Sequence, residues 1–181
     1  DGTGITDSVL SNYEAIVPPQ TPSRIKSEIS SLPKDQLLLS NGEFDVYYAY
    51  AHQAPLCLEE IGRLREITFR AVNEGTGKST DIDRFDQYYT HLFMWNRERM
   101  QIAGAYRLGK TDQIVEQHGI AGLYTYSLFR YTQELLEQLG PSLELGRSFI
   151  RREYQRNFSS LLLLWRGIGQ FVVKHPMYKN L

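Results

Sequence analysis

The segment NEGTGKSTDIDRFD, residues 73–86, holds two patterns that could do chemistry. GTGKST ends like a phosphate-binding P-loop, but Val72 stands where that template needs its first glycine, and the preceding residues read as a helix instead of a strand. DIDRFD begins like a calcium loop, yet the fifth and twelfth positions of such a loop hold Phe85 and Leu92. What remains is a carboxylate motif, DxDxxD, made by Asp81, Asp83 and Asp86.

Carboxylates this close repel one another unless cations or hydrogen-bond donors face them. A solvated acidic turn is one interpretation, and a partnered site is the other. Arg107 lies in a strand-like run, and LELGRSF places Glu144 and Arg147 inside another. Residues three apart share a face only if the strand bulges, for which Gly146 is a natural position. We therefore predict one charged cluster, compatible with an ion-pair network or a functional site: Asp81, Asp83, Asp86, Arg107, Glu144 and Arg147.

A second candidate is the turn RREYQRN, residues 151–157, which joins a strand-like run to an apolar helical pattern. A helix N-terminus offers unbonded N–H groups and partial positive charge. Arg151, Arg152 and Arg156 add full charges. The turn therefore predicts a site for a phosphate or pyrophosphate arm, with a solvated basic loop as the alternative.

These motifs need regular elements to position them. Apolar periodicity predicts strands at 44–50, 88–95, 102–108 and 143–150, with NRER as a hairpin connection. It predicts helices from Pro55 to about residues 73–75, over 124–139, and from Ser159 or Ser160 to about Lys174, with a loop over 111–122. The sequence of residues 1–40 predicts a lead segment or linker, with a short helix near 24–31. A domain at 41–181 follows it. The expected fold class is α/β (α+β layered), with a mixed, mostly antiparallel sheet and helices on both faces.

Composition excludes several classes of protein. The net charge of −1 argues against a nucleic-acid binder. The single cysteine, Cys57, rules out an internal disulfide and a cysteine-based metal cluster, and we predict no metal site. No stretch reads as a signal peptide or a membrane span. We expect a cytoplasmic protein, and peripheral contact with inner-membrane lipid stays open.

The motifs in their order resemble the acyltransferase fold named after the Gcn5-related N-acetyltransferases (GNAT). Arg65 and Phe69, then DxDxxD, then Arg107-Leu108, then Glu144-x-x-Arg147 are similar to the N-acyl-homoserine lactone synthases, although the first acidic position here is Asp instead of Glu. EIGRLREITFR, FDQYYTHLF, GAYRLG and LELGRSFIRREYQRNFSSLLLLWRGI are more similar still to bacterial N-acyltransferases that make ornithine and glycine lipids, a group often labelled hemolysins. The resemblance covers about residues 44–181.

The resemblance implies transfer of a fatty acyl group, in particular a 3-hydroxyacyl group, from acyl carrier protein or acyl-CoA to the amino group of a small amino acid. The amine must lose a proton, so a carboxylate base is needed. Glu144 is the first candidate and Asp83 the second, while Arg107 and Arg147 orient the carboxylates or hold the substrate carboxylate. Backbone amides from Ser148 to Ile150 would stabilise the thioester oxygen. The implied donor-binding residues are Ser148, Phe149, Ile150, Arg151, Arg152, Gln155, Arg156 and Asn157.

The chain departs from the GNAT pattern in two ways. Arg156, Asn157 and Phe158 stand where glycines usually let the backbone approach the pyrophosphate, which favours a carrier-protein donor. The sequence ends in MYKNL, where another strand of the fold should begin, so we expect a domain truncated after its fourth strand and the following helix. Some relatives carry a fused phospholipid acyltransferase domain. The alternatives are a non-catalytic acyl-carrier or lipid-binding module and a hemolysin-like membrane-active protein.

Overall fold

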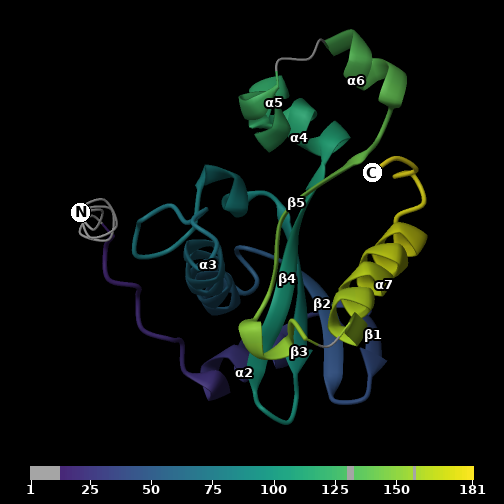
Figure 1. The fold of residues 1–181 in the computed structure, drawn as a ribbon. Helices are drawn as coiled ribbons and strands as arrows, with labels where there is room; N and C mark the ends of the chain where they lie inside the picture. Colours follow the sequence, from purple (N-terminus) through teal and green to yellow (C-terminus); the bar gives the residue numbers. More distant parts are fainter. Residues whose placement is uncertain (1–12, 130–132, 157) are drawn as a thin grey trace, which may run out of the picture.

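A five-stranded antiparallel sheet, with its strands in sequence order, carries helices on both faces (Figure 1). The computed structural model describes residues 13–129, 133–156 and 158–181. The strands are β1 Leu37–Asn41, β2 Phe44–Tyr50, β3 Thr90–Asn96, β4 Gln101–Lys110 and β5 Leu143–Ile150. The helices are α2 Pro22–Ser31, α3 Pro55–Arg70, α4 Thr111–His118, α5 Tyr124–Leu128, α6 Gln133–Leu139 and α7 Phe158–Lys174, with 3-10 turns η1 Lys34–Gln36, η2 Arg84–Gln87, η3 Ile120–Gly122 and η4 Arg152–Tyr154. The predicted fold class is confirmed.

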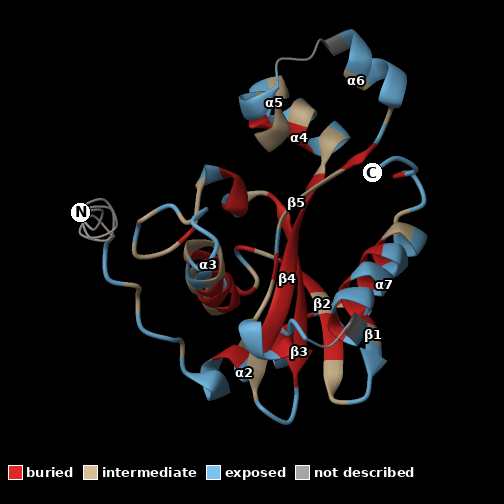
Figure 2. Ribbon diagram, in the orientation of Figure 1, coloured by how far each residue is buried: buried red, intermediate tan, exposed pale blue. Residues whose placement is uncertain are grey.

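The middle of the sheet is buried on both faces, as Figure 2 shows for β3 and β4. Successive side chains of a strand point to opposite faces, so Leu92 and Phe93 belong to different cores. One core joins the sheet to α2 and α3 and includes Ile25, Ile61, Leu64, Phe93 and Ile102. The other joins it to α7 and includes Val46, Leu92, Leu164, Ile168 and Phe171. Burial of these apolar side chains fixes the sheet between the helices.

The first part of the chain is more ordered than the sequence predicted. The helix expected near 24–31 is α2, and it packs Ile25 and Ile29 against α3. Leu37–Asn41 form β1, which pairs with β2 and was missed because the run LLLSN does not alternate. The sheet therefore begins before residue 41, and the strand predicted as the fourth is the fifth.

Two further predictions, both between β4 and β5, were wrong. The loop expected over 111–122 contains α4 and η3. The single helix expected over 124–139 ends at Leu128, where the following Phe129 has an extended backbone (φ −132°), and a separate helix, α6, ends at Leu139. These helices form a helical insertion, defined here as residues 111–139 without the undescribed 130–132, which lies beyond one end of the sheet (Figure 1).

Strand β5 has a bulge beside Arg147, one of its two charged side chains; the other is Glu144. Gly146 pairs with Arg107 and Phe149 pairs with Ala105, so β5 uses one residue more than β4 over this interval. The bulge was predicted at Gly146, but Arg147 carries the left-handed backbone conformation, with φ 49°. Near the other end of β5, Leu143 N donates to Asn180 O at 3.0 Å, beside a parallel bridge between Ser142 and Asn180.

Candidate active site

The DxDxxD motif is a structured turn instead of a solvated one. Asp83 is the N-cap of η2, and its carboxylate accepts from Phe85 N at 2.9 Å and Asp86 N at 3.2 Å. Asp86 Oδ2 accepts in return from Asp83 N at 2.9 Å, which completes a capping box. Asp81 and Asp86 are buried, whereas the Asp83 side chain is 27% exposed. The sequence motif therefore presents only one partly accessible carboxylate.

Two buried arginines hold Asp86. Its Oδ1 lies 2.8 Å from Nη1 of Arg65 and 3.2 Å from Nη1 of Arg107, which also donates to Asp83 at 2.7 Å. Burial acts to raise the pKa of Asp86, but the charges of Arg65 and Arg107 outweigh it and hold that pKa at about 2. The carboxylate is therefore ionised at neutral pH and ties α3, η2 and β4 together.

Arg65 was not among the predicted site residues. Its signal was visible in the sequence, because Arg65 occupies an apolar position of the α3 stripe, four residues after Ile61. An arginine that is fully buried needs an acid partner.

Arg147 joins the same cluster from β5. Its Nη1 donates to Asp81 at 2.8 Å, and its Nη2 lies 3.8 Å from Asp83. Burial outweighs the charge of Arg147 and raises the pKa of Asp81. The predicted association of the three aspartates with Arg107 and Arg147 is therefore present.

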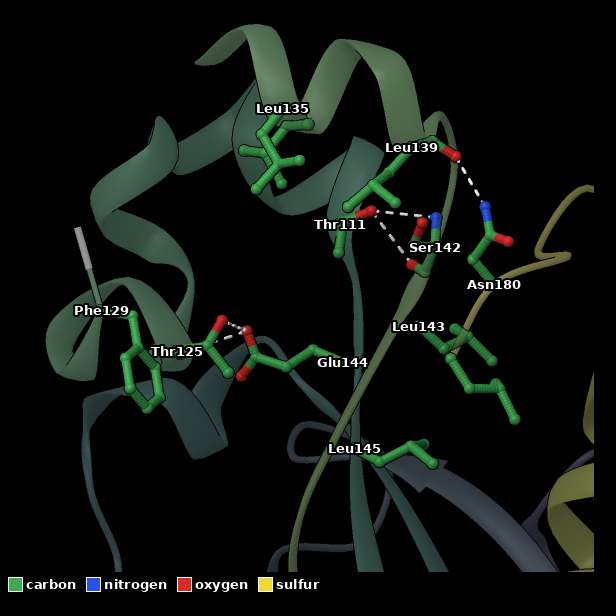
Figure 3. Close-up of a pocket in the computed structure, with 12 residues that line it drawn as sticks. Thr111, Thr125, Phe129, Leu135, Leu139, Ser142, Leu143, Glu144, Leu145 and Asn180 are labelled. Carbon is green, nitrogen blue, oxygen red and sulfur yellow. Dashed lines mark hydrogen bonds between the residues drawn. The ribbon is translucent and has the colours of Figure 1, made fainter. Parts of the chain in front are cut away.

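Glu144 does not join these ion pairs, and the prediction that it does was wrong. Its carboxylate instead accepts from the Tyr89 hydroxyl at 3.0 Å, the Thr125 hydroxyl at 2.8 Å and the Thr125 amide at 3.3 Å. Figure 3 shows the contact with Thr125 at the edge of a cavity. The ring of Tyr89 connects the two groups, because the Arg107 guanidinium carbon lies 5.1 Å from its centre.

Three cavities follow β5 from its C-terminal turn to its beginning. The first, of about 620 Å³, is lined by residues of α3 and by Arg151, Arg152 and Gln155. The second, of about 370 Å³, shares Phe69 and Glu74 with it and is lined by Arg147 and Ser148. The third, of about 470 Å³, lies between β5 and α6 and has Glu144 in its wall among apolar side chains that include Leu135, Leu139, Leu143 and Leu145 (Figure 3).

The other predicted donor-binding residues differ in their accessibility. Phe149 is buried in the core under α3, so its side chain is closed to a ligand, whereas Ile150 is partly buried against the core under α7. Arg156 is exposed, and Asn157 lies outside the described residues. The donor-binding roles remain predictions.

The P-loop-like residues bind a carboxylate of the protein itself. Buried Glu66 accepts from Thr76 N at 3.1 Å, Thr76 Oγ1 at 2.7 Å and Gly77 N at 2.9 Å. These amides are therefore committed to an internal anion, and the loop is held against α3.

Residues 64–166 match the family described as the acetyltransferase (GNAT) domain. The chain belongs to the GNAT acetyltransferase family. The match spans Arg65, the DxDxxD turn, Arg107, Glu144, Arg147 and the RREYQRN turn. The predicted family and the predicted enzyme class, a GNAT-type acyltransferase, are thereby confirmed.

Two curated proteins are similar to this chain in sequence over most of its length. The chain is 36% identical over 178 residues to proteins named glycine N(alpha)-acyltransferase from Phocaeicola vulgatus and from Bacteroides thetaiotaomicron. The alignments cover 92% of this chain but only 54% and 52% of the relatives, so the chain spans about half their length. No solved structure gives a significant match.

Burial shifts the pKa values of two further side chains in this GNAT domain, Cys57 and His91. It raises the pKa of the Cys57 thiol, and together with the charge of Arg65 it lowers the pKa of His91 to about 4.

Among the described residues, no helix has the length and apolar character needed to cross a bilayer, and no group of three or more His, Cys, Asp or Glu is arranged to hold a metal ion.

Proposed function

We propose that this chain transfers a fatty acyl group from a thioester donor to the amino group of a small amino acid, with glycine as the first acceptor to test. The observation that carries the proposal is the apolar cavity with a carboxylate in its wall. The cavity of about 470 Å³ offers an apolar lining to an acyl chain, and Glu144 lies where the reacting carbonyl would be held. The names of the two relatives favour glycine as acceptor.

The donor would lie along β5. From Glu144 to Ile150 the strand extends about 20 Å at roughly 3.3 Å per residue, which suits an extended phosphopantetheine arm. The phosphate end would meet Arg151 and Arg152, and the acyl end would enter the cavity beside α6. Burial of the acyl chain stabilises this orientation by about 0.8 kcal/mol for each methylene group.

Exposed arginines at the phosphate end favour a donor whose surface is acidic. Arg152 and Arg156 are exposed, and Arg151 has only a long ion pair of 3.4 Å with Glu153. Acyl carrier protein is our proposed donor, and acyl-CoA is the alternative because its phosphates would suit the same arginines.

Glu144 is the proposed base. It accepts a proton from the acceptor amine as the new nitrogen–carbon bond forms, and the carbon–sulfur bond of the thioester then breaks. The departing thiolate takes up a proton, so the products are an amide and a thiol.

The remaining charged residues suit supporting roles. Arg107 is only 1% exposed and Asp86 is fully buried, so we assign both to holding the turn in place instead of contacting substrate. Arg147 is partly exposed beside the second cavity, but Asp81 already neutralises its charge. Asp83, with its partly exposed carboxylate, is the second candidate base.

The decisive experiment incubates the protein with acyl carrier protein thioester, or with acyl-CoA, and a panel of amino acids, with mass detection of N-acyl products. Glu144→Gln should keep the fold and lose transfer. Glu116→Gln removes an exposed carboxylate of α4 and is the matched control, which should keep full activity. Full activity in Glu144→Gln excludes Glu144 as the base. Tight donor binding without turnover in the unmodified protein supports the non-catalytic binding module instead.

We further propose that the outer face of α7 contacts an anionic lipid surface. Leu161, Leu162 and Trp165 are 42–51% exposed there. From Tyr154 to Leu181 the sequence has four arginines and lysines and no aspartate or glutamate, although the whole chain has a net charge of −1. Apolar side chains beside cations favour an interfacial position. Co-sedimentation with anionic vesicles that weakens in Trp165→Ser supports the contact, and equal binding by both proteins refutes it.

A further inference from the structure

Tyr89 lies between the ion-pair cluster and Glu144, just before β3. It is 1% exposed, and its ring packs edge-on against Phe85, with the centres 5.9 Å apart. Gly109 pairs with Glu144 in the sheet, and a Cβ atom at that glycine would lie 2.6 Å from Tyr89 Cε2. A residue larger than glycine would therefore displace the ring, so the sheet itself leaves the space that Tyr89 occupies.

The hydrogen bonds of the Tyr89 hydroxyl fix the direction of its proton. The hydroxyl accepts from Tyr124 N at 2.8 Å, and it has only one proton to donate. That proton points to Glu144 Oε1 at 3.0 Å. Together with the two hydrogen bonds from Thr125, this contact fixes the orientation of the Glu144 carboxylate.

We propose that Tyr89 is a positioning residue that holds the Glu144 carboxylate correctly oriented at the apolar cavity. This rests on the proposed function of Glu144 as the base. Tyr89 also places Glu144 relative to the DxDxxD turn, because its ring contacts Phe85 of η2 and faces the guanidinium of Arg107. The motif at Asp81 to Asp86 would thus act on the reaction indirectly, through the position of one phenol.

The groups around Glu144 come from the segment before β3, from β4 and from α5. Tyr89 and Tyr88 precede β3, and Arg107 on β4 lies against the Tyr89 ring. From α5, Thr125 offers an amide and a hydroxyl. The orientation of the Glu144 carboxyl should therefore depend on the Tyr89 hydroxyl more than on any other single hydroxyl except that of Thr125.

Tyr88 supplies a closely matched control. Its hydroxyl donates to Gly122 O at 2.7 Å, so both tyrosines bond the backbone of the helical insertion, but only Tyr89 bonds Glu144. Tyr89→Phe and Tyr88→Phe each remove one hydroxyl and keep a ring that fills the same space. A merely structural role would give the two variants similar consequences.

The experiment measures the carbon-13 chemical shift of the Glu144 carboxyl at neutral pH in the unmodified chain, in Tyr89→Phe and in Tyr88→Phe, with the signal assigned from Glu144→Gln. We expect Tyr89→Phe to move this signal, because it removes a hydrogen bond that the carboxylate accepts, and Tyr88→Phe to leave it in place. The rate of acyl transfer should fall roughly tenfold or more in Tyr89→Phe, as for loss of a hydrogen bond to a charged group, and stay unchanged in Tyr88→Phe.

An unmoved Glu144 signal in Tyr89→Phe, or an equal change in Tyr88→Phe, overturns the inference. The NMR result does not need activity, so absence of acyl transfer would refute the proposed function separately. Gly109→Ala is a second variant, which keeps the hydroxyl but displaces the ring. It should also move the Glu144 carboxyl signal, and a folded Gly109→Ala protein with an unmoved signal counts against the role of Tyr89.

Discussion

Replacing Asp86 by asparagine should destabilise the fold strongly, although asparagine has nearly the same shape. Asp86 is fully buried and carries the negative charge between Arg65 and Arg107. Asparagine keeps an oxygen that can accept hydrogen bonds, but it leaves two buried guanidinium groups with too little negative charge. Removing one partner of a buried ion pair costs about 3–5 kcal/mol. For a chain of this length that predicts a fall in Tm of roughly 6–20 °C.

The pH dependence of the same variant gives an independent check on the magnitude. The pKa of Asp86 is about 2 in the folded protein, below its ordinary value of 3.8. A depressed carboxyl pKa contributes stability that is present above the unfolded value and is lost as pH falls through the folded value. The difference in unfolding free energy between the unmodified protein and Asp86→Asn should therefore shrink by roughly 2–3 kcal/mol between about pH 5 and pH 1.

Urea unfolding followed by circular dichroism measures both effects. Asp83→Asn is the matched control, because asparagine still caps η2 and the Asp83 side chain is 27% exposed. Its cost should be about 1 kcal/mol or less. If Asp86→Asn costs no more than Asp83→Asn, or if its deficit does not shrink in acid, the cluster does not stabilise the fold as argued.

Two other predictions concern α3. Gly62→Ala places a Cβ 2.4 Å from Ile82 Cγ1 and should lower the free energy of unfolding, measured with urea, by about 1–3 kcal/mol. Gly169→Ala on α7 places a Cβ that meets no atom within 4 Å and should raise that free energy by roughly 0.5–1 kcal/mol. Equal effects of the two changes would contradict the packing argument. Cys57 is 1% exposed and burial raises its pKa, so a thiol reagent at pH 8 should modify it only after unfolding, and rapid modification of the native protein would show that α3 opens locally.

The sequence predicted elements well where one physical signal dominated. Phe44–Tyr50 alternates and is a strand, and Pro55 begins the helix that follows. Buried charges need partners, so the association of the DxDxxD turn with Arg107 and Arg147 could be inferred without a structure. The helix α4 was missed because only Ile114 of its eight residues is buried, which leaves almost no apolar periodicity.

The position of Glu144 could not be predicted in the same way. Its partners come from Tyr89, which lies 55 residues away, and from Thr125, on a helix whose placement depends on packing against η2 and the segment just before β3. A buried carboxylate in an apolar strand needs a partner, and either a cation or neutral hydrogen-bond donors can meet that need. Periodicity and charge give no reason to choose the phenol and the hydroxyl over Arg107, and only the tertiary packing decides between them.

The bulge in β5 explains how one strand can present both a cation and a carboxylate to α5. Glu144 contacts Thr125, and the Arg147 guanidinium carbon lies 5.6 Å from the centre of the Tyr124 ring, so both side chains reach α5. In a flat strand, residues three apart would point to opposite faces. The extra residue is placed at Arg147, whose positive φ costs on the order of 1–3 kcal/mol, although Gly146 beside it could adopt such a conformation at little cost. The ion pair with buried Asp81 supplies an opposing stabilisation, which suggests that the strained position is occupied for its side chain instead of its backbone.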